Sequence, residues 1–153
     1  MWDELDARFA VDSDWRLERG PVTAKSVTPM RSWVTEPMRY GSLFLAGDSA
    51  HIVPPTGAKG LNLAVADVVV LAAALADRHA TGSQDALDAY SATCLRRVWQ
   101  AQHFSSFMTT ALHTDPRDTP FDAQVRLARL HRIADSAAAS AELAEHYTGL
   151  PIG

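Results

Sequence analysis

The sequence contains one cysteine, Cys94, among 153 residues, so an internal disulfide is excluded. Its six histidines show no H-E-x-x-H or similar paired spacing, and the sequence therefore predicts no metal site. Cys94 falls on the apolar side of an expected helix together with Leu87, Tyr90 and Val98. This position predicts a buried packing role for the thiol rather than a reactive one.

Positive charge and clean apolar runs are also scarce. Scattered basic residues and a net charge of −4 argue against a nucleic-acid-binding surface. The first residues, Met1-Trp2-Asp3-Glu4, lack the basic and apolar parts of a signal peptide. The longest apolar segment is interrupted by Asp67 and is expected to fall short of the roughly 20 residues that span a bilayer. We therefore expect a cytoplasmic protein with neither a nucleic-acid partner nor a membrane segment.

The glycines do not form the G-x-G-x-x-G turn that holds the ADP half of a dinucleotide. They stand at positions 20, 41, 47, 57, 60, 82, 149 and 153. The sequence also lacks G-x-S-x-G, and Asp48, Ser49 and His51 are too close in sequence to supply a catalytic triad by themselves, so a serine esterase is only a remote alternative reading of Gly47-Asp48-Ser49.

One stretch combines a strand, a carboxylate, a tight turn and a helix start. The apolar run 43–46 predicts a buried strand whose end presents Asp48 to a ligand. The stiff loop 54–60 follows, and the apolar segment 61–76 predicts a helix that is buried on most of its faces. The unpaired N–H groups of Gly60, Leu61 and Asn62 would place about +0.5 of an elementary charge at the helix mouth. An anion, or a carbonyl that gains negative charge, would be held there.

The remaining pattern is mostly helical. Proline after Thr119 and glycine at the expected helix ends give clear start and stop signals. The expected elements are a helix over 2–10, an extended segment over 25–34, a helix over 60–80 that ends at Thr81-Gly82, a helix capped by Ser83 that runs to about 112, and a helix from Thr119-Pro120 that breaks near 135–136 and resumes until Gly149 and Pro151.

Residues 43–62 resemble the second flavin-binding motif of the class A flavoprotein aromatic hydroxylases. Further segments share the likeness, which covers essentially the whole chain: residues 29–33, 36–38, 94–99 and 147–151. The resemblance implies an α/β fragment of an FAD-binding, glutathione-reductase-like fold, with a few strands in the first third and three or four long helices after them. It also implies that 1–40 belong to a substrate-domain sheet, 41–82 to the FAD-binding domain and 83–153 to a C-terminal helical region.

The implied activity is hydroxylation of 4-hydroxybenzoate, or a similar small phenolic acid, ortho to its hydroxyl. FAD would be the cofactor and NADPH the co-substrate, in a full-length enzyme able to form a homodimer. Because the G-x-G-x-x-G half-site is missing, we do not expect this chain to be active alone. A non-catalytic truncated fragment or helical interaction module is the alternative.

The resemblance also implies flavin contacts. Asp48 would accept hydrogen bonds from the ribityl chain, and the N–H groups of Leu61 and Asn62 would face the flavin pyrimidine carbonyl. Gly57, Lys59 and Gly60 would complete the cradle for the cofactor. Asn62 could equally be a polar residue at a helix start, and Lys59 a solvated loop lysine.

Other residues would act on the substrate side. Pro55, with Thr56 next to it, would lie beside the phenol hydroxyl, and Tyr147 would belong to a proton relay that ionises the phenol. Arg31 would hold the pyridine nucleotide. The alternatives are an aromatic packing residue for Tyr147 and a surface side chain for Arg31. His51 is either part of a proton path or a structural histidine.

Overall fold

The computed structural model describes residues 1–10 and 16–149. Its helices are α1 (Trp2–Phe9), α2 (Gly60–Thr81), α3 (Asp85–Leu112), α4 (Pro120–Asp135) and α5 (Ala137–Thr148). Between α1 and α2 lie four two-residue strands, β1 (Trp33–Val34), β2 (Arg39–Tyr40), β3 (Leu43–Phe44) and β4 (His51–Ile52), and two 3₁₀ turns, η1 (Gly47–Ser49) and η2 (Pro55–Gly57). This order agrees with the expected α/β fragment.

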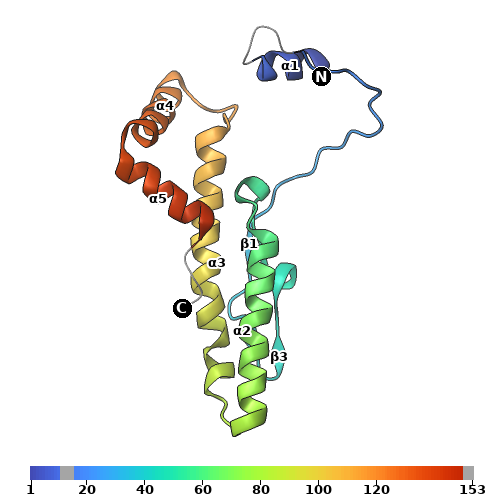
Figure 1. Ribbon diagram of the computed structural model, residues 1–153, viewed down its shortest axis with the longest axis vertical. Helices are drawn as coiled ribbons and strands as arrows, with labels where there is room; N and C mark the ends of the chain where they lie inside the picture. Colours follow the sequence, from blue (N-terminus) through green and yellow to red (C-terminus); the bar gives the residue numbers. More distant parts are fainter. Residues whose placement is uncertain (11–15, 150–153) are drawn as a thin grey trace.

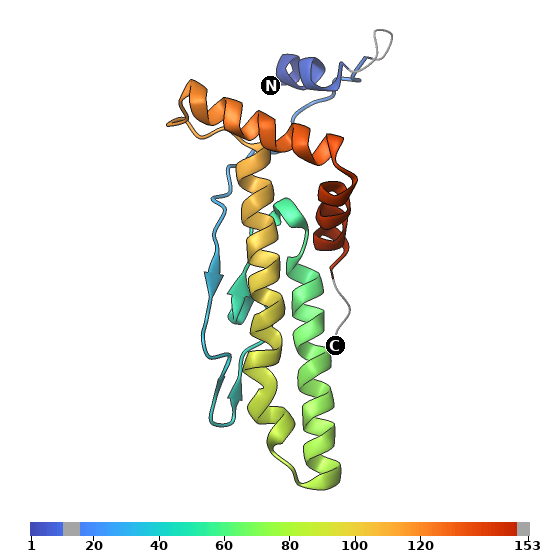
Figure 2. The same ribbon diagram turned by 90° about the vertical axis from the view of Figure 1, so that its left-hand side faces the viewer.

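An antiparallel hairpin of α2 and α3 forms the long axis of the molecule (Figures 1 and 2). Gly82 joins the two helices with φ +81°, a left-handed value that suits glycine at a helix end. Ser83 Oγ accepts a hydrogen bond from the Asp85 N–H at 3.1 Å, but the N-cap of α3 is Gln84 rather than the predicted Ser83. The strands lie along one side of this hairpin.

The C-terminal helices begin where the sequence predicts. Thr119 Oγ1 accepts from the Asp122 N–H, and the Asp122 carboxylate accepts from the Thr119 N–H at 2.9 Å, which forms a capping box at the start of α4. The chain then breaks at Ser136, whose hydroxyl accepts from the Ala139 N–H. α4 crosses the end of α3, and α5 returns along the hairpin (Figure 2). α5 ends at Gly149, as predicted, whereas Pro151 lies outside the described residues.

In the part of the chain that the structure describes, two clusters of buried residues pack against α3. Around Tyr90 and Cys94, which are 0% and 4% exposed, pack Met38 and Ala50 from the strand region. Tyr90 Oη also donates to the Leu45 carbonyl at 2.8 Å. A second cluster joins α2 to α3 through Leu63, Val98 and Ala101. The predicted packing role of Cys94 is therefore confirmed.

The strand predictions were only partly right. Only Trp33 and Val34 of the expected segment 25–34 form a strand, which pairs antiparallel with β4. Residues 43–46 do not form a buried strand, because β3 covers only Leu43 and Phe44 and Leu43 is 60% exposed. β3 instead closes a tight hairpin with β2 through Gly41, at φ +58°.

The prediction that α2 is buried on most of its faces was wrong. Its buried residues, Leu63, Ala66, Asp67 and Ala74, face α3 and the strand region, and 22% of its apolar window is buried. An opposite apolar stripe stays exposed and includes Leu61, Val65, Val68, Val69 and Leu75. At 22 residues α2 is also long and apolar enough to cross a membrane, so the expected shortfall in length was wrong. One such helix is weak evidence, since core helices pass the same test.

Gly57 tests the contact between η2 and α3. A Cβ at this position would lie 2.8 Å from Ser105 Oγ and 3.0 Å from the Phe104 ring. We expect Gly57→Ala to lower the free energy of unfolding by about 1–3 kcal/mol, because neighbouring side chains must shift. Urea denaturation followed by circular dichroism measures this loss. Gly60→Ala is the matched control, since no atom lies within 4 Å of its added Cβ; equal midpoints for the two variants would contradict the expectation.

Candidate functional site

Asp48 lies at the centre of η1, exposed to solvent. The turn begins with Gly47 at φ +61°, and the Ala50 N–H donates back to the Gly47 carbonyl at 2.8 Å. A Cβ on Gly47 would lie 3.1 Å from the Ala64 Cβ, so the turn packs closely against the start of α2. Asp48 therefore lies, exposed, in a turn that packs on the first turns of α2.

A buried carboxylate on α2 supports this turn. Asp67 Oδ2 accepts from the Gly47 N–H at 2.9 Å and lies 2.7 Å from His51 Nε2. Asp67 and His51 are 2% and 1% exposed. An ionised carboxylate only accepts hydrogen bonds, so His51 Nε2 carries the proton in this pair. This contact fits the structural reading of His51, one of the two that the sequence leaves open.

Two further titratable groups lie beside this pair. Burial, together with the negative charge of Asp67, raises the pKa of the Cys94 thiol to about 12. Burial is also the main cause of the raised pKa of the Tyr90 hydroxyl, with smaller effects from Cys94 and Asp67. Both groups therefore stay protonated near neutral pH.

The loop before α2 is rigid and closely packed. Pro55 is exposed, whereas Gly57 is buried against Phe104. Thr56 Oγ1 forms a 2.8 Å hydrogen bond with Thr109 Oγ1, which ties the loop to α3. Ala58 has φ +50°, a left-handed value rare for a residue with a Cβ.

The N-terminus of α2 has no side-chain cap among the described contacts. Its first N–H groups belong to Gly60, Leu61 and Asn62. The residue Leu61 is 76% exposed. The side chain of Asn62 is also exposed. These N–H groups and the helix dipole make a site that favours negative charge.

Lys59 joins this helix start to the end of α5. Its ammonium donates to the Tyr147 carbonyl and lies 5.4 Å from the Phe104 ring centroid and 5.5 Å from that of Tyr147. Phe104 and Tyr147 pack edge to face with centroids 6.0 Å apart. Partial burial lowers the pKa of Lys59. The structure thus brings together Lys59 and Tyr147, which are 88 positions apart in the sequence.

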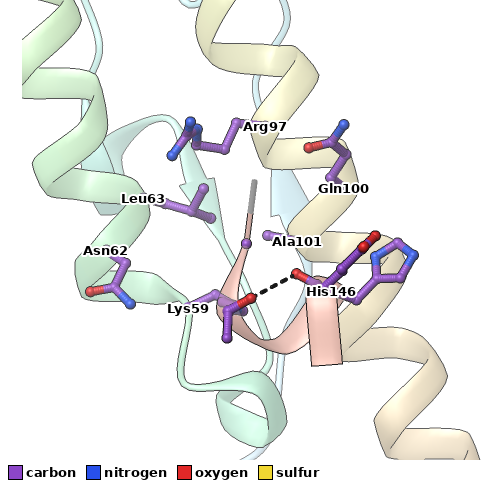
Figure 3. A pocket seen from close by; sticks show the side chains of 10 residues that line it. Lys59, Asn62, Leu63, Arg97, Gln100, Ala101 and His146 are labelled. Carbon is purple, nitrogen blue, oxygen red and sulfur yellow. Dashed lines mark hydrogen bonds between the residues drawn. The ribbon is translucent and has the colours of Figure 1, made fainter. Parts of the chain in front are cut away.

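A cavity of about 160 Å³ lies between α2, α3 and the end of α5 (Figure 3). Asn62 and Leu63 approach it from α2, and Arg97 and Gln100 from α3. The full lining is Lys59, Asn62, Leu63, Arg97, Gln100, Ala101, Glu145, His146, Thr148 and Gly149. Polar side chains from three helices converge on this space.

Of the ten predicted site residues, Lys59 and Asn62 line this cavity and the other eight do not. Arg31 is exposed in the segment before β1, and Asp48 lies on the η1 side of α2. Neither of them lines the cavity. The predicted site residues therefore do not all meet in this one cavity.

Residues 1–105 match the family model described as the FAD binding domain. The chain belongs to this FAD-binding family. Within it, the chain is similar to p-hydroxybenzoate hydroxylase from Acinetobacter baylyi, with 51% identity over 151 residues, which are 99% of this chain and 37% of that enzyme.

More distant relatives are also flavin-related or oxygenating enzymes by name. The chain is 41% identical over 73 residues to tetracenomycin B2 monooxygenase-dioxygenase from Streptomyces olivaceus, which covers 46% of this chain and 14% of the relative. It is 38% identical over 77 residues to 6-hydroxy-3-succinoylpyridine 3-monooxygenase HspB from Pseudomonas putida, which covers 50% and 20%. The chain thus spans little more than a third of the length of even the Acinetobacter enzyme.

The polar groups described above would suit one end of a flavin. An exposed carboxylate suits hydroxyl donors, and uncapped helix N–H groups suit an electron-rich carbonyl. Lys59 adds positive charge to the same helix end. FAD is the cofactor of the family to which the chain belongs.

The sequence reasoning missed the residues that support the site. Asp67 was treated only as an interruption of an apolar helix, and Gln102, which donates to the Ile52 carbonyl at 2.7 Å, was not singled out. The signal was present in both cases. Asp67 is a lone acid inside an apolar helix, and Gln102 is an amide on the apolar side of α3. Each of these polar groups needs a buried hydrogen-bond partner.

Cys94 provides a chemical test of the buried cluster. Its thiol has a pKa of about 12 rather than 9.0, so the thiolate near pH 8 is roughly a thousandfold rarer than in the unfolded chain. We expect iodoacetamide to alkylate the folded chain at least that much more slowly than the urea-unfolded chain, as measured by mass spectrometry. Comparable rates in the two states would show that the thiol is accessible and ionised.

Proposed function

We propose that this chain is part of an FAD- and NADPH-dependent monooxygenase that hydroxylates 4-hydroxybenzoate, or a similar phenolic acid, ortho to its hydroxyl. The observation that carries the proposal is the η1 turn, which carries the exposed Asp48 and whose Gly47 packs against Ala64 near the uncapped N-terminus of α2. The 51% identity to p-hydroxybenzoate hydroxylase over nearly the whole chain supports the choice of substrate. Bound FAD would supply the redox chemistry and the activation of oxygen.

In this proposal the chain binds and polarises the flavin. Asp48 accepts hydrogen bonds from the ribityl hydroxyls, and the N–H groups of Leu61 and Asn62 face the pyrimidine carbonyl. The positive end of α2 then stabilises negative charge on the reduced ring. Gly60 leaves room for the cofactor, and Lys59 adds to the positive potential. The space beside Gly57 is filled by Phe104 and Ser105, so Gly57 would contact the cofactor only through its backbone.

The substrate side involves the loop and the end of α5. Pro55 and Thr56 would lie beside the phenol hydroxyl, and Tyr147 would take part in removing its proton. The contacts of Lys59 with Tyr147 support a single site built from both segments. Arg31 would contact the pyridine nucleotide, and residues 1–40, 41–82 and 83–153 would belong to the substrate domain, the FAD-binding domain and the C-terminal helical region.

The esterase alternative has little geometric support. Ser49 Oγ donates to the Ala46 carbonyl at 2.8 Å, while the His51 ring bonds to Asp67. Among the described contacts, nothing links the serine to the histidine as a nucleophile and base require.

The non-catalytic alternative draws support from α2. Its exposed apolar stripe and the 37% coverage of the Acinetobacter enzyme both indicate that this chain alone is an incomplete enzyme. A FAD titration of the folded 153-residue chain separates a flavin-binding module from a fragment without cofactor affinity.

Asp48→Ala tests the flavin contact. We expect the dissociation constant for FAD to rise about tenfold or more, because hydrogen bonds to a charged acceptor are lost. Calorimetric titration measures the affinity, and circular dichroism checks the fold. Asp77→Ala is the matched control, since Asp77 is an exposed carboxylate near the other end of α2. Equal affinity in Asp48→Ala and wild type would remove Asp48 from the flavin site.

Tyr147→Phe tests the proton relay while keeping the ring contact with Phe104. The assay uses this chain fused to the remaining sequence of the Acinetobacter hydroxylase, to supply the parts it lacks. We expect about a tenfold or greater fall in hydroxylated product formed from 4-hydroxybenzoate, since an acid–base group is removed. Tyr40→Phe, at an 85% exposed tyrosine, is the control. A Tyr147→Phe enzyme as fast as the control would exclude the relay role.

A further inference from the structure

Asp67 is a buried charge two turns inside an apolar helix. It is 2% exposed, and its neighbours on α2, Ala66 and Val68, are apolar. Burial of a carboxylate is costly unless its oxygens are hydrogen-bonded. The partners of Asp67 therefore indicate what the charge does.

One oxygen of Asp67 serves two partners on the same segment. Oδ2 accepts from the Gly47 N–H at 2.9 Å and binds the His51 ring nitrogen at 2.7 Å. These partners stand on either side of Asp48 in the sequence. The single carboxylate thus fastens both ends of the five-residue segment that presents Asp48.

Other contacts of the turn do not replace this one. The Ser49 hydroxyl donates to the Ala46 carbonyl at 2.8 Å and accepts from the Ala46 N–H at 3.2 Å, so its bonds stay inside the turn. Ala64 limits how close Gly47 can come to α2, but this apolar contact does not fix the orientation of the Gly47 backbone. The bond from the Ala50 N–H to the Gly47 carbonyl also stays inside the turn, whereas the bond from the Gly47 N–H to Asp67 ties the Ala46–Gly47 peptide to α2 in a defined direction.

We propose that Asp67 is a positioning residue for the flavin site. By holding Gly47 and His51 through one oxygen, it fixes η1 against α2 and sets the direction in which the Asp48 carboxylate leaves the turn. The inference rests on the proposed function for the identity of the ligand, but not for the hydrogen bonds themselves.

Amide NMR of the 153-residue chain tests the positioning directly. In Asp67→Ala we expect the amide signals of Gly47, Asp48 and Ser49 to move and the Gly47 N–H to exchange at least tenfold faster. In Asp67→Asn the side-chain oxygen still accepts, so the turn should stay in place while the Gly47 proton shifts upfield with loss of the charge. Asp77→Ala, on the same helix, should change none of these signals.

FAD titration of the same variants links the turn to the ligand. We expect Asp67→Ala to weaken binding about tenfold, as when groups that orient a binding residue are removed. Asp67→Asn should stay within about threefold of wild type, because its oxygen can still orient the turn. If Asp67 only filled space, Asp67→Asn would not differ from Asp67→Ala in this way. Retained FAD affinity in Asp67→Asn therefore distinguishes a positioning role from a packing role.

Different results would contradict the positioning role of Asp67 and the proposed binding of FAD. A folded Asp67→Ala chain with unmoved η1 amides, or with moved amides and unchanged FAD affinity, overturns the positioning role. Where Asp67→Ala does not fold, an unchanged Gly47 proton shift in Asp67→Asn overturns it. A wild-type chain that does not bind FAD counts against flavin binding by this chain alone, and the amide signals then decide the positioning role.

Discussion

The packing of α2 on α3 determines where the candidate site residues lie. Leu63, Val98 and Ala101 fill the interface, and the N-terminus of α2 is held at the level of Phe104 on α3. The loop before α2 then has little freedom, because Gly57 touches Phe104 and Thr56 bonds to Thr109. A helix end that is fixed in this way can hold its N–H groups in place before a ligand arrives, and such preorganisation lowers the cost of binding.

Hydrogen bonds from the helices hold the segments without regular structure in place. The strands are only two residues long, so their ladders contribute few bonds. Tyr90 and Gln102 on α3 instead bind the carbonyls of Leu45 and Ile52, one before and one after η1. The helical hairpin therefore acts as the support on which an irregular, ligand-facing segment is held.

The helix limits were predictable from the sequence because their signals are local. Thr119, Ser136 and Gly82 each act within a few residues of the position where they stand. The exposure of α2 was not predictable, because composition shows that a face is apolar but not whether this chain covers it. The same reason explains Leu43, whose apolar side chain packs on nothing that encloses it.

The candidate site was predictable in part. The helix mouth at residues 60–62 and the exposed Asp48 follow from short motifs, and the structure places both near the start of α2. The bond between Asp67 and Gly47 spans 20 positions and depends on how η1 folds back on the helix. Tertiary bonds of this kind have no periodic signature in a sequence. The domain boundaries and the individual ligand roles stay predictions.

The contact between Lys59 and Tyr147 has a consequence for the order in which the molecule assembles. Its partners are 88 positions apart, whereas α2 and α3 are neighbours along the chain. Local helix pairs form faster than contacts that close long loops. On the ribosome, where about 5–20 residues are added each second, the hairpin can pack while α5 is still unsynthesised. The aromatic side of the helix mouth is therefore completed after the hairpin has packed, when α5 emerges.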